Sequence, residues 1–395
     1  MNGIAEDSAT REFSLGVGGP MYDLLLKTRL ARPPLLLLHR RLLVIPALAW
    51  LPLLVLTLAE GRAVGGVAIP FLHDVEAYSR FLVALPILVM AEVILHQCLS
   101  DVVSQFRQRR IVPPEAELRF SVAIDSAMRL RDSKSPELVM LAMVLVVAPL
   151  AWHYAPELPA STWYADVENG RVALTRAGWW FVHASVPLSQ FLILRLYFRF
   201  FIWGRFLQQV ARLPLNLTPA HPDRSGGLGF LEESVPGLLP VVLAQATIAS
   251  GFIASRVLFD GRNVLDFRVD IGVLVVALLV LILLPLCFYA PRLVVERWRA
   301  LRGYGALATS YVRGFERKWF DGQQPKDEEL LGSADIQSLN DLAGSYEIVN
   351  GIRPVPFGAR TVVQVLAVAL VPFLPLLFTV LSLPELLSRL AKMLL

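Results

Sequence analysis

Two ionisable side chains interrupt an apolar stretch near residue 95. Glu92 and His96 stand four residues apart in LVMAEVILHQCL, so a helix would place them on one face. An ionisable group inside a membrane crossing is a functional candidate, and a Glu–His pair could relay protons or line an ion path. The alternative is that Glu92 is protonated or hydrogen-bonded to a neighbouring helix, with His96 at the membrane interface.

Three further polar residues lie in later apolar segments. His183 and Gln190 are seven residues apart and share a helix face, and Gln245 lies among small residues in PVVLAQATIASGFIASR. With Glu92 and His96 they form a candidate polar pathway. Small side chains also allow helices to approach closely, so tight packing is the alternative for the segment that holds Gln245.

The connection LNLTPAHPDRSGGLGFLEESVPG, residues 215–237, is the most distinctive polar stretch. Its glycines could present backbone N–H groups to an anion, with an Arg adding positive charge. The candidate anion-binding loop comprises His221, Asp223, Arg224, Gly226, Gly227 and Gly229. One His and one Asp are too few ligands to indicate a metal site. The alternative is a structural turn that positions the next helix.

Motifs of the common hydrolase and redox classes are absent from the sequence. It holds no HExxH, GxSxG or CxxC motif, and Cys98 and Cys287 fall within or at the end of apolar segments. We therefore predict no catalytic residue, metal or cofactor, and a membrane-embedded enzyme ranks third among the function classes. The net charge of +4 is explained by cations beside a membrane, so we predict the lipid bilayer as a partner and no nucleic acid.

Composition indicates a polytopic membrane protein. The 395 residues are 55% hydrophobic and 18% charged, with a mean hydropathy of +0.56. Several apolar runs approach the ~20 residues that a helical crossing needs. The predicted fold class is all-α: a transmembrane helix bundle of about seven crossings with a helical cytoplasmic layer. The crossings are expected at 42–59, 81–99, 136–154, 178–201, 238–257, 271–290 and 362–382.

The 37 Lys and Arg residues gather in alternate connections, and this asymmetry sets the orientation. Because cytoplasmic connections carry the excess of cations, the N-terminus is predicted to be cytoplasmic, and the Arg-rich composition suggests a bacterial inner membrane. Arg195 and Arg199 close the fourth crossing on the inner side, where we expect them to extend to lipid phosphates. Pro372 and Pro375 interrupt the last segment, so a full crossing and a re-entrant hairpin both stay open.

This topology divides the chain into four regions. They are a cytoplasmic segment with a short interfacial helix (1–41), six crossings with cytoplasmic loops at 100–135 and 204–237 (42–291), a cytoplasmic helical insertion (292–361), and the last crossing with its tail (362–395). Apolar residues recur every three or four positions from Val294 to Trp319, which requires a partner helix. We predict packing against a helix over 114–131; two separate helices lying on the membrane surface are the alternative.

Three strings carry a resemblance to a family. HPDRSGGLGFL at 221–231 resembles a string of uncharacterised bacterial multi-pass membrane proteins. DIQSL at 335–339 and RPVPF at 353–357 are similar to other parts of the same group. The resemblance covers most of the chain from the third crossing onward. It implies a helical inner-membrane protein and carries no known activity.

Two function classes therefore lead. The first is a small-solute or ion transporter or channel, with its pathway between the second, fourth and fifth crossings. The second is a non-catalytic membrane scaffold or sensor. Its cytoplasmic helices would bind a cytosolic protein or a second copy of the chain, and its 221–229 loop would bind an anionic ligand. A water-filled cavity reaching Glu92 would favour transport, and a dry, packed bundle would favour a scaffold.

Overall fold

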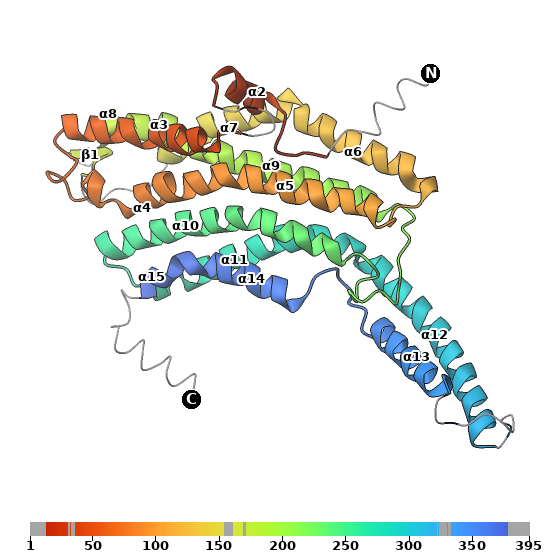
Figure 1. Ribbon diagram of the computed structural model, residues 1–395. Coiled ribbons are helices and arrows are strands. Elements are labelled where there is room, and N and C mark those ends of the chain that lie inside the picture. Colours follow the sequence, from red (N-terminus) through yellow and green to blue (C-terminus); the bar gives the residue numbers. More distant parts are fainter. Residues whose placement is uncertain are drawn as a thin grey trace, which may run out of the picture.

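The computed structural model is a bundle of long helices from which a two-helix arm projects at one end (Figure 1). It describes residues 13–30, 32, 36–153, 161–168, 171–321, 323, 330 and 333–377. In chain order the elements are α2 (Pro20–Lys27), α3 (Leu38–Ala59), α4 (Val75–Tyr78), α5 (Leu85–Gln108), α6 (Glu117–Asp132), α7 (Lys134–His153), β1 (Ala165–Glu168), β2 (Arg171–Leu174), α8 (Arg176–Trp180), α9 (Val186–Ala211), α10 (Val235–Phe259), α11 (Arg268–Leu283), α12 (Ala290–Trp319), α13 (Asp335–Asn350), α14 (Ala359–Leu370) and α15 (Leu374–Leu377).

Seven helical spans among the described residues are long and apolar enough to cross a membrane. They are Leu38–Ala59, Val75–Gln108, Lys134–Trp152, Arg176–Ala211, Gly229–Phe259, Val264–Trp319 and Ala359–Leu377. Each overlaps one predicted crossing, so the all-α polytopic prediction is confirmed. The end of the predicted seventh crossing and the tail, 378–395, lie outside the described residues.

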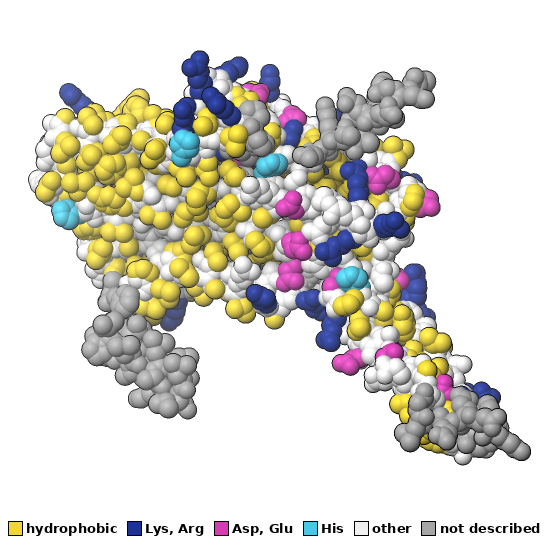
Figure 2. All heavy atoms as spheres, viewed as in Figure 1, with side chains coloured by type: hydrophobic (Ala, Val, Ile, Leu, Met, Phe, Trp, Pro, Cys, Tyr) yellow, Lys and Arg dark blue, Asp and Glu magenta, His cyan; other side chains and the backbone are white. Residues whose placement is uncertain are grey.

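On the face shown in Figure 2, the surface of the bundle away from the arm is largely apolar. Leu43, Val139 and Val273, from three different helices, are 71%, 64% and 64% exposed. Exposure of a continuous apolar surface of this kind is unfavourable in water, whereas it is favourable in contact with lipid tails. The chain is therefore an integral membrane protein with several crossings.

Helix α10 lies at the centre of the bundle and packs against α5, α11, α14 and the segment around α4 (Figure 1). The buried share of its apolar stretch, 56%, is the highest among the seven spans. Small residues permit this approach, because a Cβ at Gly251 would overlap the side chain of Ser79. Ala246 and Ala254 are buried on the same helix. The small faces of α10 thus serve close helix packing.

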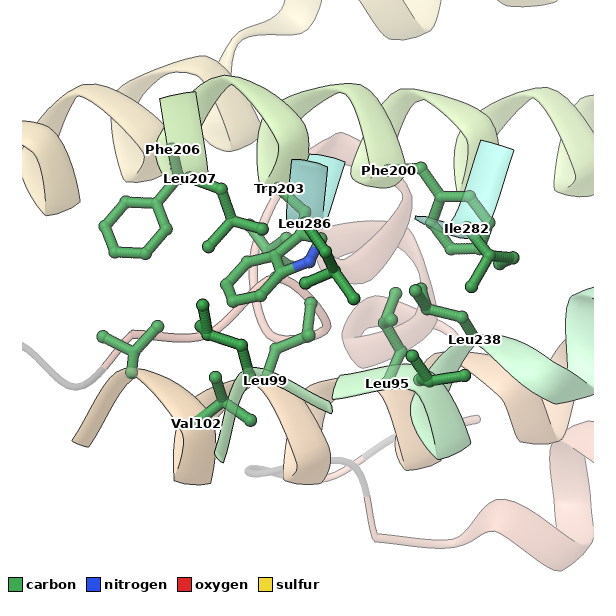
Figure 3. Close-up of a cluster of buried hydrophobic side chains, with 14 of the residues drawn as sticks. Leu95, Leu99, Val102, Phe200, Trp203, Phe206, Leu207, Leu238, Ile282 and Leu286 are labelled. Atoms are coloured by element: carbon green, nitrogen blue, oxygen red, sulfur yellow. The ribbon is translucent and has the colours of Figure 1, made fainter. Parts of the chain in front are cut away.

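The largest apolar core lies where α5, α9, α10 and the end of α11 with the turn that follows it converge (Figure 3). Its labelled members are Leu95, Leu99, Val102, Phe200, Trp203, Phe206, Leu207, Leu238, Ile282 and Leu286. The N-terminal segment joins this core, since the Phe13 ring lies 6.0 Å from the Trp203 ring and 4.9 Å from the Phe206 ring. Contacts of this kind hold the chain ahead of α2 against the helices.

Helix α12 is the last part of the Val264–Trp319 span and extends out of the bundle. Helix α13 folds back along α12, and the two helices form the arm (Figure 1). The predicted packing of this helix against 114–131 is wrong, because α12 pairs with α13 and α6 pairs with α9. The apolar face of α6 is occupied by the bundle: the Phe120 ring lies 6.0 Å from the Phe206 ring of α9. The apolar face of α6 is therefore already buried against α9 and is not available to the arm.

The end of the bundle opposite the arm carries an antiparallel hairpin, β1–β2, that the sequence pattern did not predict (Figure 1). Next to it the buried indole of Trp163 donates from Nε1 to Asp74 at 2.8 Å. Arg62 holds Asp166 of β1 through two hydrogen bonds of 2.7 and 2.9 Å. These contacts fasten the hairpin to the loop between α3 and α4.

Candidate functional site

Five charged side chains are buried together inside the bundle, and we call them the ion network. They are Arg41 of α3, Glu92 of α5, Glu137 of α7, and Arg195 and Arg199 of α9, none more than 8% exposed. Charged side chains are almost never fully buried unless they are paired. The network is thus the most unusual polar feature of the described membrane spans.

Arg195 is the central member of the ion network. Its Nη1 donates to Glu92, and its Nε donates to Glu137 at 3.2 Å. Arg41 Nη1 reaches Glu92 at 3.5 Å, and Arg199 Nη2 lies 4.0 Å from Glu137. The two carboxylates are therefore held between three guanidinium groups from two helices.

The chain ahead of α2 covers the ion network. Gly18 accepts a hydrogen bond from Arg199 Nη2 at 3.0 Å, and the backbone N–H of Met21 donates to Glu137 at 2.8 Å. Gly18 and Gly19 adopt positive φ angles of 123° and 91°, a conformation that glycine takes without strain. Glu137 thus satisfies one of the free N–H groups in the first turn of α2.

This arrangement corrects one expectation. Arg195 and Arg199 do not extend to lipid phosphates, since each is 3% exposed and faces carboxylates inside the protein.

Glu92 was identified from the sequence, and bonding to a neighbouring helix was one of the two interpretations left open. Arg41 and Glu137 were not identified as site residues. The available signal was that each is the fourth residue of an apolar helix.

The other four residues of the predicted pathway are not members of the ion network. His183 stacks on Trp179 with ring centres 4.7 Å apart, and Gln245 donates to the Tyr197 hydroxyl at 2.5 Å. His96 and Gln190 are half-buried. The cavity beside Glu92 has a volume of about 10 Å³, and its described lining includes none of these four side chains. That volume holds about one water molecule.

The candidate anion-binding loop already contains an anion of its own. The Asp223 carboxylate accepts hydrogen bonds from the backbone N–H groups of Ser225 at 2.8 Å, Gly227 at 3.2 Å and Gly229 at 2.8 Å. His221 Nδ1 lies 3.0 Å from the same carboxylate. Burial raises the pKa of Asp223, but these backbone bonds and His221 outweigh it, so the pKa lies below its ordinary value.

The loop also joins separate parts of the chain. Arg353, which precedes α14, donates from its backbone N–H to the carbonyl of Arg224 at 2.8 Å and from Nη2 to the carbonyl of Asp223 at 2.8 Å. Arg224, Gly226 and Gly227 have positive φ angles of 52°, 64° and 91°. The loop therefore acts as a junction between the α9–α10 connection and the chain that returns from the arm.

The arm is fastened at both ends and open in the middle. At the tip Asp335 accepts from Lys318 Nζ at 2.7 Å and from Trp319 Nε1 at 3.0 Å, and both bonds hold its pKa below the ordinary value. At the base Val349 packs against Ala300. Between them lies a groove of about 440 Å³ lined by Gly305, Ala308, Thr309, Val312, Leu339, Leu342, Ala343 and Tyr346.

Comparisons with known proteins add no relative to this picture. No protein-family model, no curated protein and no solved structure matches the chain. The resemblance of the 221–231 string to uncharacterised bacterial membrane proteins stays a prediction. Among the described residues, no group of three or more His, Cys, Asp or Glu side chains could hold a metal ion.

The substitution Glu92→Gln tests how much the ion network contributes to the stability of the folded protein. The change leaves Arg41 and Arg195 without a full counter-charge, and breaking a buried pair in this way costs roughly 3–5 kcal/mol. We expect a clearly lower thermal unfolding temperature for the purified protein in detergent. Glu233→Gln is the control, because this carboxylate is 57% exposed at 4.0 Å from Arg109 and should contribute less than about 1 kcal/mol. Equal losses in the two variants would contradict the assignment.

Asp223→Asn tests the loop as a structural junction. A folded pKa below the unfolded value means that the ionised carboxylate stabilises the fold above the unfolded pKa, and that this contribution is lost as the pH falls through the folded pKa. At pH 7 we expect a cost of about 1–3 kcal/mol and faster hydrogen exchange at 225–229. The difference from wild type should shrink below about pH 4. An exposed control, Asp341→Asn, should show neither effect.

Proposed function

We propose that the protein is a non-catalytic membrane scaffold that associates with a second copy of itself through the arm. The observation that carries this proposal is the open apolar groove between α12 and α13. Helices in water are stabilised mainly by burying an apolar face. Between the two fastened ends of the arm, the described residues lining the groove are only half-buried or exposed.

Charge favours a second copy as the occupant of the groove. The sequence of α12 contains seven Arg and Lys residues and two Glu, whereas α13 contains three acidic residues and no basic one. Two copies in one membrane share the same orientation, so their arms project to the same side. A two-fold axis along the membrane normal would place each α13 beside the partner's α12, which pairs opposite charges and antiparallel helices.

The resulting assembly would be a four-helix bundle outside the membrane. Leu339, Leu342 and Val312 would leave water on association, and full burial of a side chain of this size contributes about 1.5–3 kcal/mol. In the orientation that the Arg and Lys distribution predicts, this bundle lies in the cytoplasm. The membrane helices would then anchor and space the paired arms.

Leu339→Asp should abolish the association. A carboxylate in the groove would be buried without a partner, and we expect the dimer dissociation constant to rise at least about tenfold. Sedimentation or light scattering of the purified full-length protein in detergent measures this constant. Asn340→Asp adds the same charge at the neighbouring exposed position and should leave the constant unchanged.

A second pair of variants does not depend on the stability of the arm. Ala343→Cys, in the groove, should be joined into a covalent dimer by a short bis-maleimide that spans the two diagonally placed α13 helices, whereas Gln337→Cys, outside the groove lining, should not. A wild-type protein that stays monomeric at micromolar concentration, with no cross-link at position 343, would rule out self-association. If such a monomer instead bound a helix of a cytosolic protein at a one-to-one ratio, the groove would have a different partner.

Transport is the second candidate function, and the ion network is the observation that favours it, since buried ionisable groups mark many ion pathways. The single-water size of the cavity beside Glu92 weighs against it. We expect proteoliposomes to show no flux of protons, chloride, alkali cations or small organic solutes above that of empty liposomes. A flux that is present in wild type and altered in Glu92→Gln would reject the scaffold in favour of transport.

A further inference from the structure

Helix α2 lies across the side of the bundle where the apolar spans of α3 and α7 begin. Its buried Leu25 packs with Val93 of α5, and the backbone N–H of Met21 donates to Glu137 in the first turn of α7 at 2.8 Å. The ion network joins that turn to the first turn of α3. Because the apolar spans start at this level, α2 occupies the level of the lipid headgroups.

Four cationic side chains are exposed on α2 and on its connection to α3, and we call them the basic cluster. They are Lys27, Arg29, Arg32 and Arg40. The backbones of Arg32 and Leu36 exchange hydrogen bonds of 2.8 and 3.3 Å, which fold the connection back toward the start of α3. Figure 2 shows Lys and Arg side chains gathered at the position that α2 has in Figure 1.

The basic cluster differs from other cations near this end of the bundle. None of its members forms an ion pair with a described carboxylate. Arg107 of α5, by contrast, lies 2.7 Å from Glu117. Arg131 of α6 lies 2.7 Å from Asp132. The basic cluster is therefore accessible to an anion that comes from outside the chain.

Arg29 stands at a backbone position that favours glycine. Its φ angle is 56°, and it directly follows the end of α2, where the N–H of Leu30 donates to the carbonyl of Leu25 at 2.9 Å. Glycine or asparagine is the usual residue at this position after a helix, because a side chain makes the left-handed conformation unfavourable. An Arg here places a charge on the surface at a conformational cost.

Exposed leucines accompany these cations. Leu24, three residues before Lys27 on α2, is 53% exposed, and Leu36, which pairs with Arg32, is 59% exposed. Asp23 is also exposed in the first turn of α2, where an acidic residue suits the positive end of a helix. Leucines beside cations are typical of segments whose apolar side chains enter the acyl boundary while their charges meet lipid phosphates. A soluble anion would need no such leucines.

We propose that the basic cluster binds the headgroup phosphate of an anionic phospholipid such as phosphatidylglycerol. A guanidinium group donates two parallel hydrogen bonds to phosphate oxygens, and a lipid in the adjacent leaflet presents its phosphate at the level of α2. The net negative charge of the headgroup distinguishes this ligand from zwitterionic phosphatidylcholine. The site lies on the bundle, so it does not depend on the groove of the arm.

Lipid titration of the purified full-length protein in detergent, followed by native mass spectrometry, tests the site. Wild type should bind phosphatidylglycerol more tightly than phosphatidylcholine. The double variant Arg29→Gln/Arg40→Gln should raise the dissociation constant for phosphatidylglycerol at least about tenfold, because each cation near an anionic lipid contributes roughly fivefold. Arg302→Gln/Arg313→Gln removes two exposed cations from the arm and should leave that constant unchanged.

Arg29→Gly separates a loss of lipid binding from a loss of folding. Glycine adopts a positive φ angle freely, so the thermal unfolding temperature in phosphatidylcholine should stay the same or rise. The dissociation constant for phosphatidylglycerol should nevertheless increase about fivefold.

Two results would overturn the proposal. The first is equal affinity of wild type for the two lipids, or wild-type affinity for phosphatidylglycerol in the Arg29→Gln/Arg40→Gln variant. The second is that glycerol phosphate, which carries the headgroup phosphate without acyl chains, binds the cluster as tightly as the lipid. That second result would assign the basic cluster to a soluble phosphate compound.

Discussion

The buried charges of the ion network constrain this bundle more tightly than any single apolar contact. Moving an ion out of water costs several kcal/mol even after relaxation, and only well-placed opposite charges and hydrogen bonds recover that cost. Glu92 and Glu137 reach their partners only if α3, α5, α7 and α9 meet at one level. Apolar side chains tolerate small shifts, whereas these charges do not. The network thus sets the relative positions of four helices and of the N-terminal segment that covers it.

Hydrogen bonds to a single carboxylate, that of Asp223, likewise organise the 221–229 loop. Asp223 places its own carboxylate among backbone N–H groups that would otherwise attract an external anion. With those donors engaged, the loop is a junction, and Arg353 attaches the returning chain to its carbonyls. The base of the arm is therefore tied to the membrane helices, while the middle of the arm is left open.

These two features divide the molecule into parts with different roles. The bundle is closely packed around α10, and the cavity beside Glu92 admits about one water. The arm, by contrast, leaves an apolar groove facing solvent. A well-packed membrane anchor joined to an incompletely buried helical pair is the architecture on which the proposal of self-association rests. In that proposal the membrane helices set the position of the arm, and the arm makes the contact with the second copy.

The sequence by itself determined the all-α class and the seven apolar spans, because apolar runs of membrane length have one stable form in lipid. It also identified Glu92, since a lone carboxylate in such a run is conspicuous. Only the tertiary structure decided which charges meet. Arg195 and Arg199 lie near the end of the predicted crossing at 178–201, where lipid phosphates and buried carboxylates are equally good partners on sequence grounds. The pairing of α12 with α13 was decided in the same way, because an apolar seam specifies that a partner is needed and not which helix supplies it.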